Sequence, residues 1–415
     1  MASVSIITIG DELLIGQTID TNSAWMAQQL NKIGVWVKRR VAVGDVWDEI
    51  WTALNEESKY SEIILITGGL GPTADDITKP LLCEYFGGKM VVSEVALQNV
   101  KDIFSKLNRP IIERNLKQAE VPDVCTVLNN KRGTAPGMWF ERGGKIYVSM
   151  PGVPHEMKGM MLDYVLPKLP ALFNLPVVYH QTLLTAGQGE SFLAEMVKDL
   201  ETNLPDNIKL AYLPNYGMVR LRLTGKGNNK EAVENEVNEK FEQLKSLVKE
   251  FMVTDTDEPM ELIVGKILRN RNKTMSTAES CTGGAIASLI TSIAGSSDYF
   301  KGSIVSYANE VKENLLHVSH DTLQTVGAVS EETVRQMVKG ALTQLKTDFA
   351  IATSGIMGPG GGNKEKPVGM VWVAVGNKKK VITQKFQWRF DRERNTDLTV
   401  QNALNMLRKF ILAES

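Results

Sequence analysis

The sequence predicts α/β domains at both ends of the 415-residue chain and a small α+β module between them. Apolar, β-branched runs alternate with segments of helical periodicity, from about residue 4 and again from about residue 260. This alternation is typical of doubly wound, mostly parallel sheets. Residues 218–224 instead alternate apolar and polar side chains, as in a half-exposed strand. The acidic, proline-ended segment 254–259 is typical of a linker.

The N-terminal unit begins with three predicted strands and two helices. The strand at residues 63–67 is apolar throughout, as expected for a central parallel strand that is buried on both faces. We expect strands at residues 4–9, 35–43 and 63–67, and helices at residues 21–34 and 46–58.

A glycine-rich loop follows the third strand. Gly68, Gly69 and Gly71 can present backbone N–H groups to phosphate oxygens, and Asp75 and Asp76 can hold a divalent cation between phosphates. Ligands of α/β sheets bind beyond the carboxyl ends of the strands, where this loop lies. Alternatively, the two acids only stabilise the dipole of the following helix. The loop is neither a P-loop nor a dinucleotide fingerprint.

Two more Gly/Pro-rich loops follow predicted strands of this unit. Residues 129–137 carry Lys131 and Arg132, and residues 150–157 follow the strand at 145–149. We expect both loops to join the glycine-rich loop in one site.

The middle module begins near Leu175. Apolar residues at helical spacing follow the strand at 218–224 and the turn at 225–229, and predict one helix with a buried stripe. Arg220 and Arg222 alternate with apolar residues, which favours a solvated sheet face over a nucleic-acid surface. The stripe consists of Val233, Val237, Phe241, Leu244 and Val248.

The C-terminal unit again alternates strands and helices. Ser330 is the expected N-cap of the helix at residues 331–345. Strands are expected at 273–277, 302–307 and 349–353 and twice within 368–390, with further helices at 260–270, 285–293, 310–316 and about 395–413.

Ser280 lies at a predicted tight turn from strand to helix. Such a turn exposes a hydroxyl beside free N–H groups of the first helical turn, and Gly283 and Gly284 let a ligand approach the backbone. This arrangement suits acyl transfer, which needs donors for an oxyanion, but it also suits phosphate binding. Ser280 as a plain N-cap is the structural alternative, and Cys281 is a rival nucleophile if the helix start lowers its pKa.

A serine nucleophile needs a base, and no histidine occurs in the loops predicted around Ser280. Lys312 is the candidate if burial keeps it neutral, and Tyr307 could relay the proton. The structural alternative is that Lys312 is an ordinary surface lysine. The loops at 307–312, 354–362 and 366–369 share a cleft with Ser280 only if their strands are neighbours.

The composition excludes several classes of protein. The formal net charge is −1, so no global basic field for nucleic acid is expected. The 3 cysteines have no paired spacing, which argues against a disulfide framework or thiolate zinc site and fits a reducing cytosol. No targeting segment or membrane span is expected, so we expect a cytoplasmic protein. His317 and His320 lack accompanying carboxylates and are interpreted as surface or cap residues.

Together these motifs resemble the CinA family of competence/damage-inducible proteins over nearly the whole chain. Residues 10–14, 68–76, 133–137 and 151–157 resemble its molybdopterin-binding-like N-terminal domain, and residues 278–284, 307–312, 327–330 and 366–369 its C-terminal deamidase domain. The resemblance implies three domains, at residues 1–172, 175–252 (KH-type) and 258–415.

By this resemblance, the C-terminal domain deamidates nicotinamide mononucleotide to nicotinic acid mononucleotide and ammonia, without a cofactor. The N-terminal domain hydrolyses ADP-ribose to AMP and ribose 5-phosphate with a divalent metal cation. The implied residues are as follows: catalytic Ser280, Lys312, Tyr307 and Thr282; substrate-binding Gly283, Gly284, Asn309, Gly355, Gly358, Gly361, Gly68, Gly69, Gly71, Thr73, Lys131, Gly133 and Thr134; metal-binding Asp75, Asp76 and Asp11.

The resemblance also implies a homodimer that binds these small nucleotides. The near-neutral net charge argues against nucleic acid as a partner, and the lack of a long apolar run argues against a membrane. Met357 stands where the family usually has alanine, and its larger side chain could narrow the pocket. Two alternatives are a molybdopterin-binding or cofactor-assembly protein, and a competence or DNA-repair accessory protein that has lost one activity.

Overall fold

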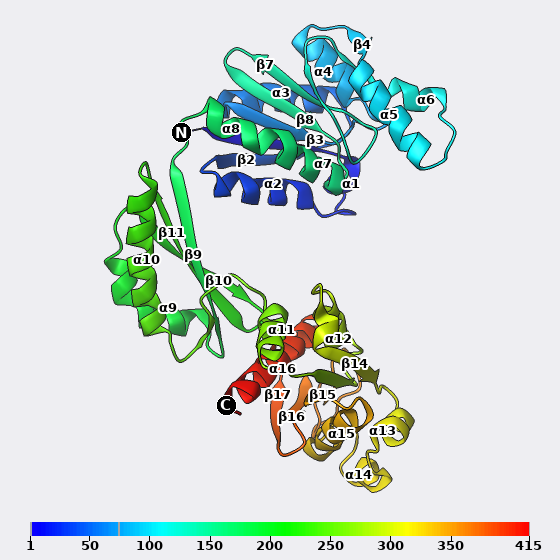
Figure 1. Ribbon diagram of the computed structural model, residues 1–415, viewed down its shortest axis with the longest axis vertical. Coiled ribbons are helices and arrows are strands. Elements are labelled where there is room, and N and C mark those ends of the chain that lie inside the picture. The colour runs from blue at the N-terminus through cyan, green and yellow to red at the C-terminus, as the bar shows by residue number, and fades with distance from the viewer. Residues whose placement is uncertain (1, 74, 415) are drawn as a thin grey trace. The chain divides into compact units, whose positions relative to one another are not determined.

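The computed structural model describes residues 2–73 and 75–414 and divides the chain into two compact units (Figure 1). Unit 1 comprises Met1–Tyr179 and Gly225–Asn235, and unit 2 comprises His180–Thr224 and Glu236–Ser415. Most of the middle module therefore groups with the C-terminal domain.

Unit 1 is built on a six-stranded sheet in the order β2-β1-β3-β8-β7-β6. The first four strands are parallel, and β7 and β6 add in antiparallel fashion. The strands are β1 (Ser3–Ile9), β2 (Trp36–Val43), β3 (Ile63–Thr67), β6 (Thr126–Leu128), β7 (Gly137–Arg142) and β8 (Lys145–Met150).

Helices cover both faces of this sheet, which confirms the doubly wound fold (Figure 1). Alternate residues of β3 point to opposite faces: Ile63 and Leu65 pack against Met26 of α2, whereas Ile64 and Ile66 pack with Leu54 of α3. One face carries α2 (Thr21–Lys32), α7 (Pro154–Met160), η1 (Met161–Val165) and α8 (Leu166–Leu172), and the other α3 (Trp47–Tyr60) and α4 (Thr78–Phe86). The remaining elements are α1 (Asp11–Leu14), β4 (Met90–Val92), α5 (Glu94–Lys106), α6 (Glu113–Lys117) and β5 (Glu120–Pro122).

The middle module is a four-stranded sheet in the order β10-β11-β9-β12, with two helices. The five apolar residues of the predicted stripe are all buried, four on α10 and Val248 directly after its end, whereas the predicted strand at 218–224 continues to Gly227. Its elements are β9 (Val177–Ala186), α9 (Glu190–Thr202), β10 (Ile208–Asn215), β11 (Met218–Gly227), α10 (Lys230–Leu247) and β12 (Met252–Thr254).

The C-terminal domain is a five-stranded sheet in the order β14-β13-β15-β16-β17. The first three strands are parallel and the last two antiparallel. Its strands are β13 (Met275–Glu279), β14 (Phe300–Val305), β15 (Phe349–Gly355), β16 (Met370–Gly376) and β17 (Val381–Gln387).

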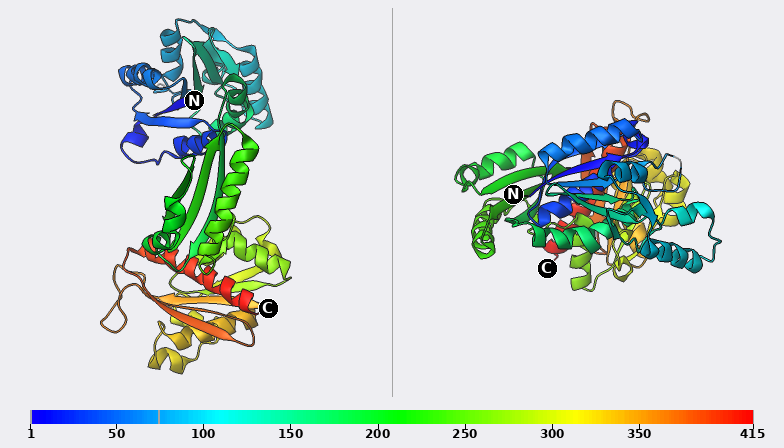
Figure 2. Two further views of the ribbon diagram at one scale, coloured as in Figure 1. Left: turned by 90° about the vertical axis from the view of Figure 1, so that its left-hand side faces the viewer. Right: turned by 90° about the horizontal axis from the view of Figure 1, so that it is seen from above.

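Helices also cover both faces of this second sheet, with α16 on one and α15 on the other (Figure 2). The first group is α11 (Met260–Asn270), α12 (Ala285–Thr291) and α16 (Arg392–Ala413), and the second is α13 (Asn309–Leu316), α14 (His320–Thr325) and α15 (Glu331–Gln344). The short 3-10 helix η2 (Ser296–Asp298) precedes β14.

Two differences from the sequence prediction matter for the site. The strand before Ser280 is β13, Met275–Glu279, two residues later than predicted, so Glu279 ends the strand and Ser280 follows directly. The last helix begins at Arg392, three residues before the predicted start. Within the described residues, no helix combines the length and apolarity required to cross a membrane.

Candidate active sites

The first candidate site is a pocket of about 280 Å³ at the carboxyl ends of β13, β14 and β15. These three strands are neighbours, with β13 in the centre, so the loops that follow them meet as the sequence predicts. The pocket is lined by Ser280, Cys281, Tyr307, Asn309, Lys312, Ala328, Val329, Ser354, Gly355, Ile356, Met357, Gly358, Gly360, Gly361 and Arg392.

Ser280 occupies the predicted turn between β13 and α12. Its N–H donates to the carbonyl of Thr353 on β15 (3.0 Å), which fixes the backbone at the edge of the sheet. Gly283 (φ 61°) and Gly284 (φ 98°) reverse the chain into the helix in a conformation that other residues rarely adopt. Neither glycine is among the residues that line the pocket, and the turn itself requires both.

Glu279 corrects the expectation that the first helical turn offers free N–H groups to a ligand. Its fully buried carboxylate accepts hydrogen bonds from the N–H groups of Gly284, Ile286 and Ala287 (3.1, 3.0 and 2.9 Å). The carboxylate therefore occupies the positive end of the helix itself. An oxyanion formed at Ser280 must find its donors elsewhere.

Lys312 is buried, with 1% of its surface exposed, although it lies on a helix. Its Nζ donates to the carbonyl oxygens of Ser306 (2.6 Å) and Tyr307 (3.2 Å). Burial lowers the pKa of Lys312 below the ordinary lysine value. A neutral amine has two N–H donors and one lone pair, so the two carbonyls satisfy its donors and leave the lone pair available. The surface-lysine alternative is wrong.

Cys281 and Thr282 differ from the expected pattern. Burial raises the pKa of Cys281 to about 12, so its thiol stays protonated at neutral pH and is a poor rival nucleophile. Thr282 does not line the pocket. Its buried hydroxyl donates to Glu279 (2.8 Å) and also contacts the Thr353 hydroxyl (2.8 Å), which places it among the supports of the turn.

Arg392 and Asn395, at the start of α16, were not predicted as site residues from the sequence. The Arg392 guanidinium donates to the carbonyl of Gly358 (2.8 Å) and to the hydroxyl of Tyr307 (3.3 Å). Asn395 is fully buried and donates to the carbonyl of Met357 (3.0 Å). The first turn of α16 therefore holds the glycine-rich pocket loop and brings a cation to the pocket. A signal existed in Asp391, whose side chain accepts from the N–H of Arg394 as the helix N-cap.

The second candidate site is a pocket of about 420 Å³ beyond the carboxyl ends of β1, β3 and β8. Its described lining contains five carboxyl groups and no lysine, arginine or histidine. The lining residues are Ile9, Gly10, Glu12, Asp45, Gly68, Gly69, Leu70, Gly71, Pro72, Asp75, Asp76, Gln118, Thr134, Ala135, Pro151, Gly152, Val153 and Glu156.

Asp76 serves the glycine-rich loop itself. Its carboxylate accepts from the N–H of Gly71 (2.8 Å), the N–H of Thr73 (2.8 Å) and the Thr73 hydroxyl. Of the N–H groups predicted to bind phosphate, that of Gly71 is thus taken by an acid of the chain, as at Glu279, and that of Gly68 donates to the carbonyl of Met150. Thr73 holds Asp76 and does not line the pocket.

Asp45 and Glu156 are two further acids that the sequence analysis did not single out. Burial raises the pKa of Asp45, and repulsion by Asp11, Glu12 and Asp75 adds to this. The Asp45 carboxylate accepts from the N–H of Asp11, and the Asp11 carboxylate from the N–H of Asp45 (3.2 and 3.1 Å), so Asp11 lies beside the pocket without lining it.

Burial also raises the pKa of Glu156, whose carboxylate accepts from Asn130 (2.6 Å). A side chain at Gly133 would collide with this carboxylate, which explains the glycine there and places it behind Glu156 instead of in the pocket lining. Lys131 pairs with Asp163 (3.6 Å), also away from the lining.

The N-terminal pocket has hard oxygen donors but no tight metal cage. Among the described residues, no group of three or more histidine, cysteine or acid side chains is close enough to hold an ion. Mg²⁺ commonly binds through one or two carboxylates plus waters and substrate phosphates. The donor set therefore fits a cation that arrives with its phosphate ligand, with Asp45, Asp75 and Asp76 as the nearest candidates.

Comparisons with known proteins match all three parts of the chain. Residues 5–171 match the family model of a probable molybdopterin binding domain, 180–253 that of the damage-inducible protein CinA KH domain, and 257–411 that of the CinA C-terminal domain.

Individual relatives match over similar extents. CinA-like proteins from Cytophaga hutchinsonii and Flavobacterium psychrophilum are each 44% identical, over 97% and 98% of both chains respectively. The crystal structure of the competence/damage inducible protein CihA from Agrobacterium tumefaciens is 40% identical and covers 36% of this chain and 92% of its own, with a TM-score of 0.36.

Proposed function

The chain belongs to the CinA family, and from this premise we propose that its C-terminal domain is a serine amidohydrolase that deamidates nicotinamide mononucleotide. The observation that carries this proposal is the pairing of Ser280 with the buried Lys312 in one pocket. The described lining of that pocket contains the cationic side chain of Arg392, the amine of Lys312 and no acid. Such a pocket attracts an anionic nucleotide without a metal.

We propose a mechanism in which Ser280 and Lys312 act together. The neutral Lys312 amine accepts the proton of the Ser280 hydroxyl while Ser280 Oγ attacks the carboxamide carbon. The tetrahedral intermediate collapses, the C–N bond breaks, and the lysine returns its proton to the leaving ammonia. Water then attacks the acyl ester, with Lys312 again accepting a proton, and releases the nicotinic acid nucleotide and Ser280.

Arg392 and Tyr307 bind instead of reacting in this scheme. The guanidinium is held by Gly358 and Tyr307 at the pocket and is suited to the phosphate of the nucleotide. The pocket volume of about 280 Å³ requires that part of the nucleotide extends beyond it. Met357 is buried in the lining, where its side chain fills space that an alanine would leave to the ligand.

The test is an assay of purified protein on nicotinamide mononucleotide, with ammonia and nicotinic acid mononucleotide measured together. We expect Ser280→Ala to abolish release of both with an unchanged thermal melt, and Cys281→Ala to remain active. Wild-type turnover in Ser280→Ala together with its loss in Cys281→Ala would assign the reaction to the thiol.

For the N-terminal domain we propose a metal-dependent pyrophosphatase that cleaves ADP-ribose to AMP and ribose 5-phosphate. The observation that favours it is the described lining with five carboxyl groups and no cationic side chain. A pyrophosphate cannot approach such a wall alone, and a bound divalent cation supplies the charge that neutralises it. Asp45 and Asp75 would hold the cation, while Asp76 braces the glycine-rich loop.

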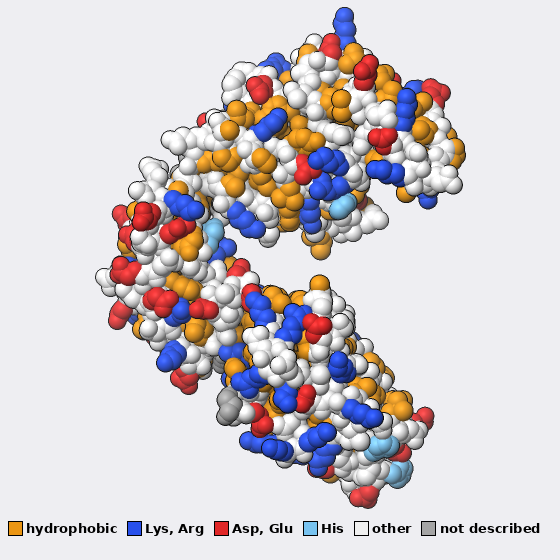
Figure 3. All heavy atoms as spheres, viewed as in Figure 1, with side chains coloured by type: hydrophobic (Ala, Val, Ile, Leu, Met, Phe, Trp, Pro, Cys, Tyr) orange, Lys and Arg blue, Asp and Glu red, His pale blue; other side chains and the backbone are white. Residues whose placement is uncertain are grey.

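Excess chelator should therefore abolish ADP-ribose cleavage, and added Mg²⁺ or Mn²⁺ should restore it. Undiminished cleavage in chelator would contradict the proposal. Tightly bound pterin in the purified protein would instead favour the cofactor-assembly alternative. Salt-dependent DNA binding would favour the alternative of a competence or DNA-repair accessory protein. Against this alternative, acidic and basic side chains are interspersed on the visible faces of both units (Figure 3).

A further inference from the structure

The middle module is built into the core of the C-terminal domain. Leu184, Ala186, Met218 and Val253 of the module belong to one buried apolar cluster together with residues of α11 and α16. Arg408 of α16, only 9% exposed, donates to the carbonyl oxygens of Met252 and Val253 in the module (3.1 and 2.9 Å). These contacts connect the module to the helix whose first turn reaches the Ser280 pocket.

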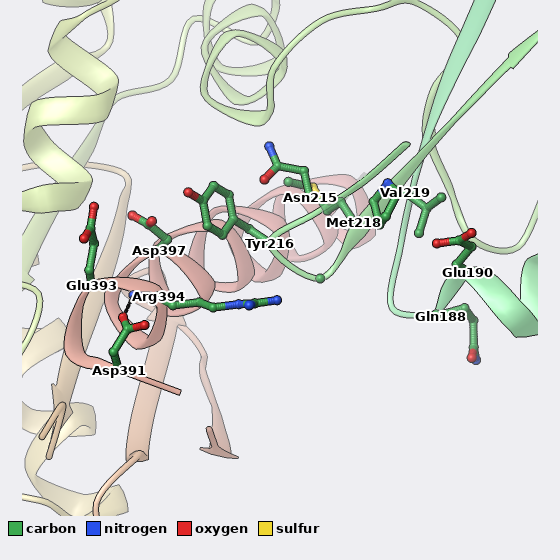
Figure 4. A pocket seen from close by; sticks show the side chains of 13 residues that line it. Gln188, Glu190, Asn215, Tyr216, Met218, Val219, Asp391, Glu393, Arg394 and Asp397 are labelled. Carbon is green, nitrogen blue, oxygen red and sulfur yellow. Dashed lines mark hydrogen bonds between the residues drawn. The ribbon is translucent and has the colours of Figure 1, made fainter. Parts of the chain in front are cut away.

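The hairpin between β10 and β11 packs against α16 shortly after that first turn. The turn consists of Tyr216 (φ 47°) and Gly217 (φ 76°), both in the left-handed conformation of a two-residue hairpin. A Cβ atom at Gly217 would lie only 3.6 Å from side-chain atoms of Leu398 and Asn402, so the hairpin backbone rests on α16. The Tyr216 hydroxyl faces the Asp397 carboxylate (Figure 4), and the proximity of this carboxylate raises the pKa of the tyrosine.

Figure 4 shows this meeting point. Tyr216 points toward Asp397, and both residues line a cavity of about 510 Å³ together with Arg394 of α16 and residues at the start of α9. The hairpin touches α16 little more than one turn after Arg392, which holds Gly358 and Tyr307. Asn395 lies between these points and holds Met357.

We propose that the hairpin tip of the middle module is a positioning element for the Ser280 pocket, which braces the first turn of α16 so that Arg392 is held against the phosphate of the substrate. This inference rests on the proposed deamidase function for the identity of the ligand. Tyr216 does not touch the pocket. Its effect passes through Asp397 to the helix start, and through Arg392 to the ligand.

If the hairpin positions Arg392, changes at Tyr216 should weaken the binding of ligands that carry a phosphate and leave other ligands unaffected. In the full-length protein, Tyr216→Phe removes the hydroxyl that meets Asp397, and should raise the KM for nicotinamide mononucleotide about fivefold with little change in kcat. Tyr216→Asp places a carboxylate against Asp397 and should raise KM further, and aspartate tolerates the left-handed backbone at this position. Nicotinamide riboside, which lacks the phosphate, should be bound equally by wild type and both variants.

Tyr212→Phe is the matched control. Tyr212 lies on β10 of the same hairpin, and its hydroxyl donates to Glu201 within the module (2.7 Å), away from α16. We expect wild-type KM for this variant. A similar loss in Tyr212→Phe would indicate general damage to the module and contradict the positioning role.

A double-mutant cycle tests the route through Arg392. In an Arg392→Ala background, Tyr216→Phe should cause no further loss, whereas equal losses in both backgrounds, or no loss in either, would overturn the inference. The dissociation constant of nicotinamide mononucleotide, measured by calorimetry, gives the same cycle without turnover. If the protein binds this nucleotide without deamidating it, the cycle still decides the inference while the proposed function fails. If the protein deamidates the nucleotide but the two substitutions have additive effects, the proposed function holds and the positioning role is contradicted. If the protein neither binds nor deamidates the nucleotide, both proposals are contradicted.

Discussion

Lys312→Arg gives the sharpest test of the proposed chemistry. Lysine can accept the Ser280 proton only when it is neutral, and burial lowers the pKa of Lys312 in the required direction. Arginine keeps a positive charge in this position at any accessible pH. The variant therefore removes the base while it preserves the charge that a phosphate would recognise.

The expected magnitude follows from the neutral fraction of the amine. An unperturbed lysine, with a pKa of about 10.4, is neutral in roughly one molecule in 2,500 at pH 7, and each unit by which burial lowers the pKa raises this fraction about tenfold. General-base catalysis typically contributes about 10²–10⁴-fold to a rate. We therefore expect kcat to fall by about that factor in Lys312→Arg, with a much smaller change in KM.

The assay is the initial rate of ammonia release from nicotinamide mononucleotide across pH 6–10. The wild-type rate should rise with pH as Lys312 loses its proton and then level off. Lys312→Met, neutral and similar in length, should be equally inactive, and it separates loss of the base from a fold disturbed by the larger guanidinium. Lys339→Arg, on the exposed surface of α15, is the control substitution and should leave the profile unchanged.

The stability of the protein provides an independent reading of the same group. Because burial lowers the pKa of Lys312 in the folded state, the unfolded chain binds its proton more tightly, and the free energy of unfolding should rise as pH increases between the two pKa values. Lys312→Met should flatten that rise.

A variant Lys312→Arg that retains most of kcat and only raises KM would contradict the role of Lys312 as the general base. This lysine would then serve to bind the phosphate.

Three further predictions concern the supports of the two sites. Glu279→Gln should lower the free energy of unfolding by about 2–3 kcal/mol, because it weakens charged hydrogen bonds to three helix N–H groups; an unchanged denaturant midpoint would contradict this. Asp76→Asn should impair ADP-ribose cleavage by loosening the glycine-rich loop, since an amide offers only one oxygen to the Gly71 and Thr73 donors, while Asp163→Asn, at a surface ion pair, should retain the activity. A fragment that begins at Thr254 should fold but unfold at lower urea than one that begins at His180, because Arg408 loses its acceptors at Met252 and Val253; equal urea midpoints would show that the middle module adds no stability.

Sequence patterns predicted the elements and the meeting of the loops because both follow from periodicity and strand order. The apolar run at residues 63–67 forms the central strand β3, and residues 280, 307 and 354 meet because β13, β14 and β15 are adjacent. The side-chain partners were less predictable. The strand β13 ends two residues later than predicted, so Glu279 is its last residue and its carboxylate faces the start of α12. Arg392 lies in a polar stretch whose periodicity carries no sign of a pocket, and only tertiary structure brings it to Gly358.

In the proposed functions, the two pockets would balance the charge of a phosphate ligand in opposite ways, for one shared reason. In each, an acid of the chain takes the backbone N–H groups beside the glycines: Glu279 at the start of α12 and Asp76 in the loop after β3. The glycines then give shape and close approach but little positive potential, so the charge that binds phosphate must come from another source. The C-terminal pocket obtains it from Arg392, because Lys312 must be neutral to act as the base. The N-terminal pocket has no cationic side chain among its described lining residues, and only a bound cation can supply the missing charge. Metal dependence is therefore expected of one activity and not of the other, and chelation of a single protein sample should separate them.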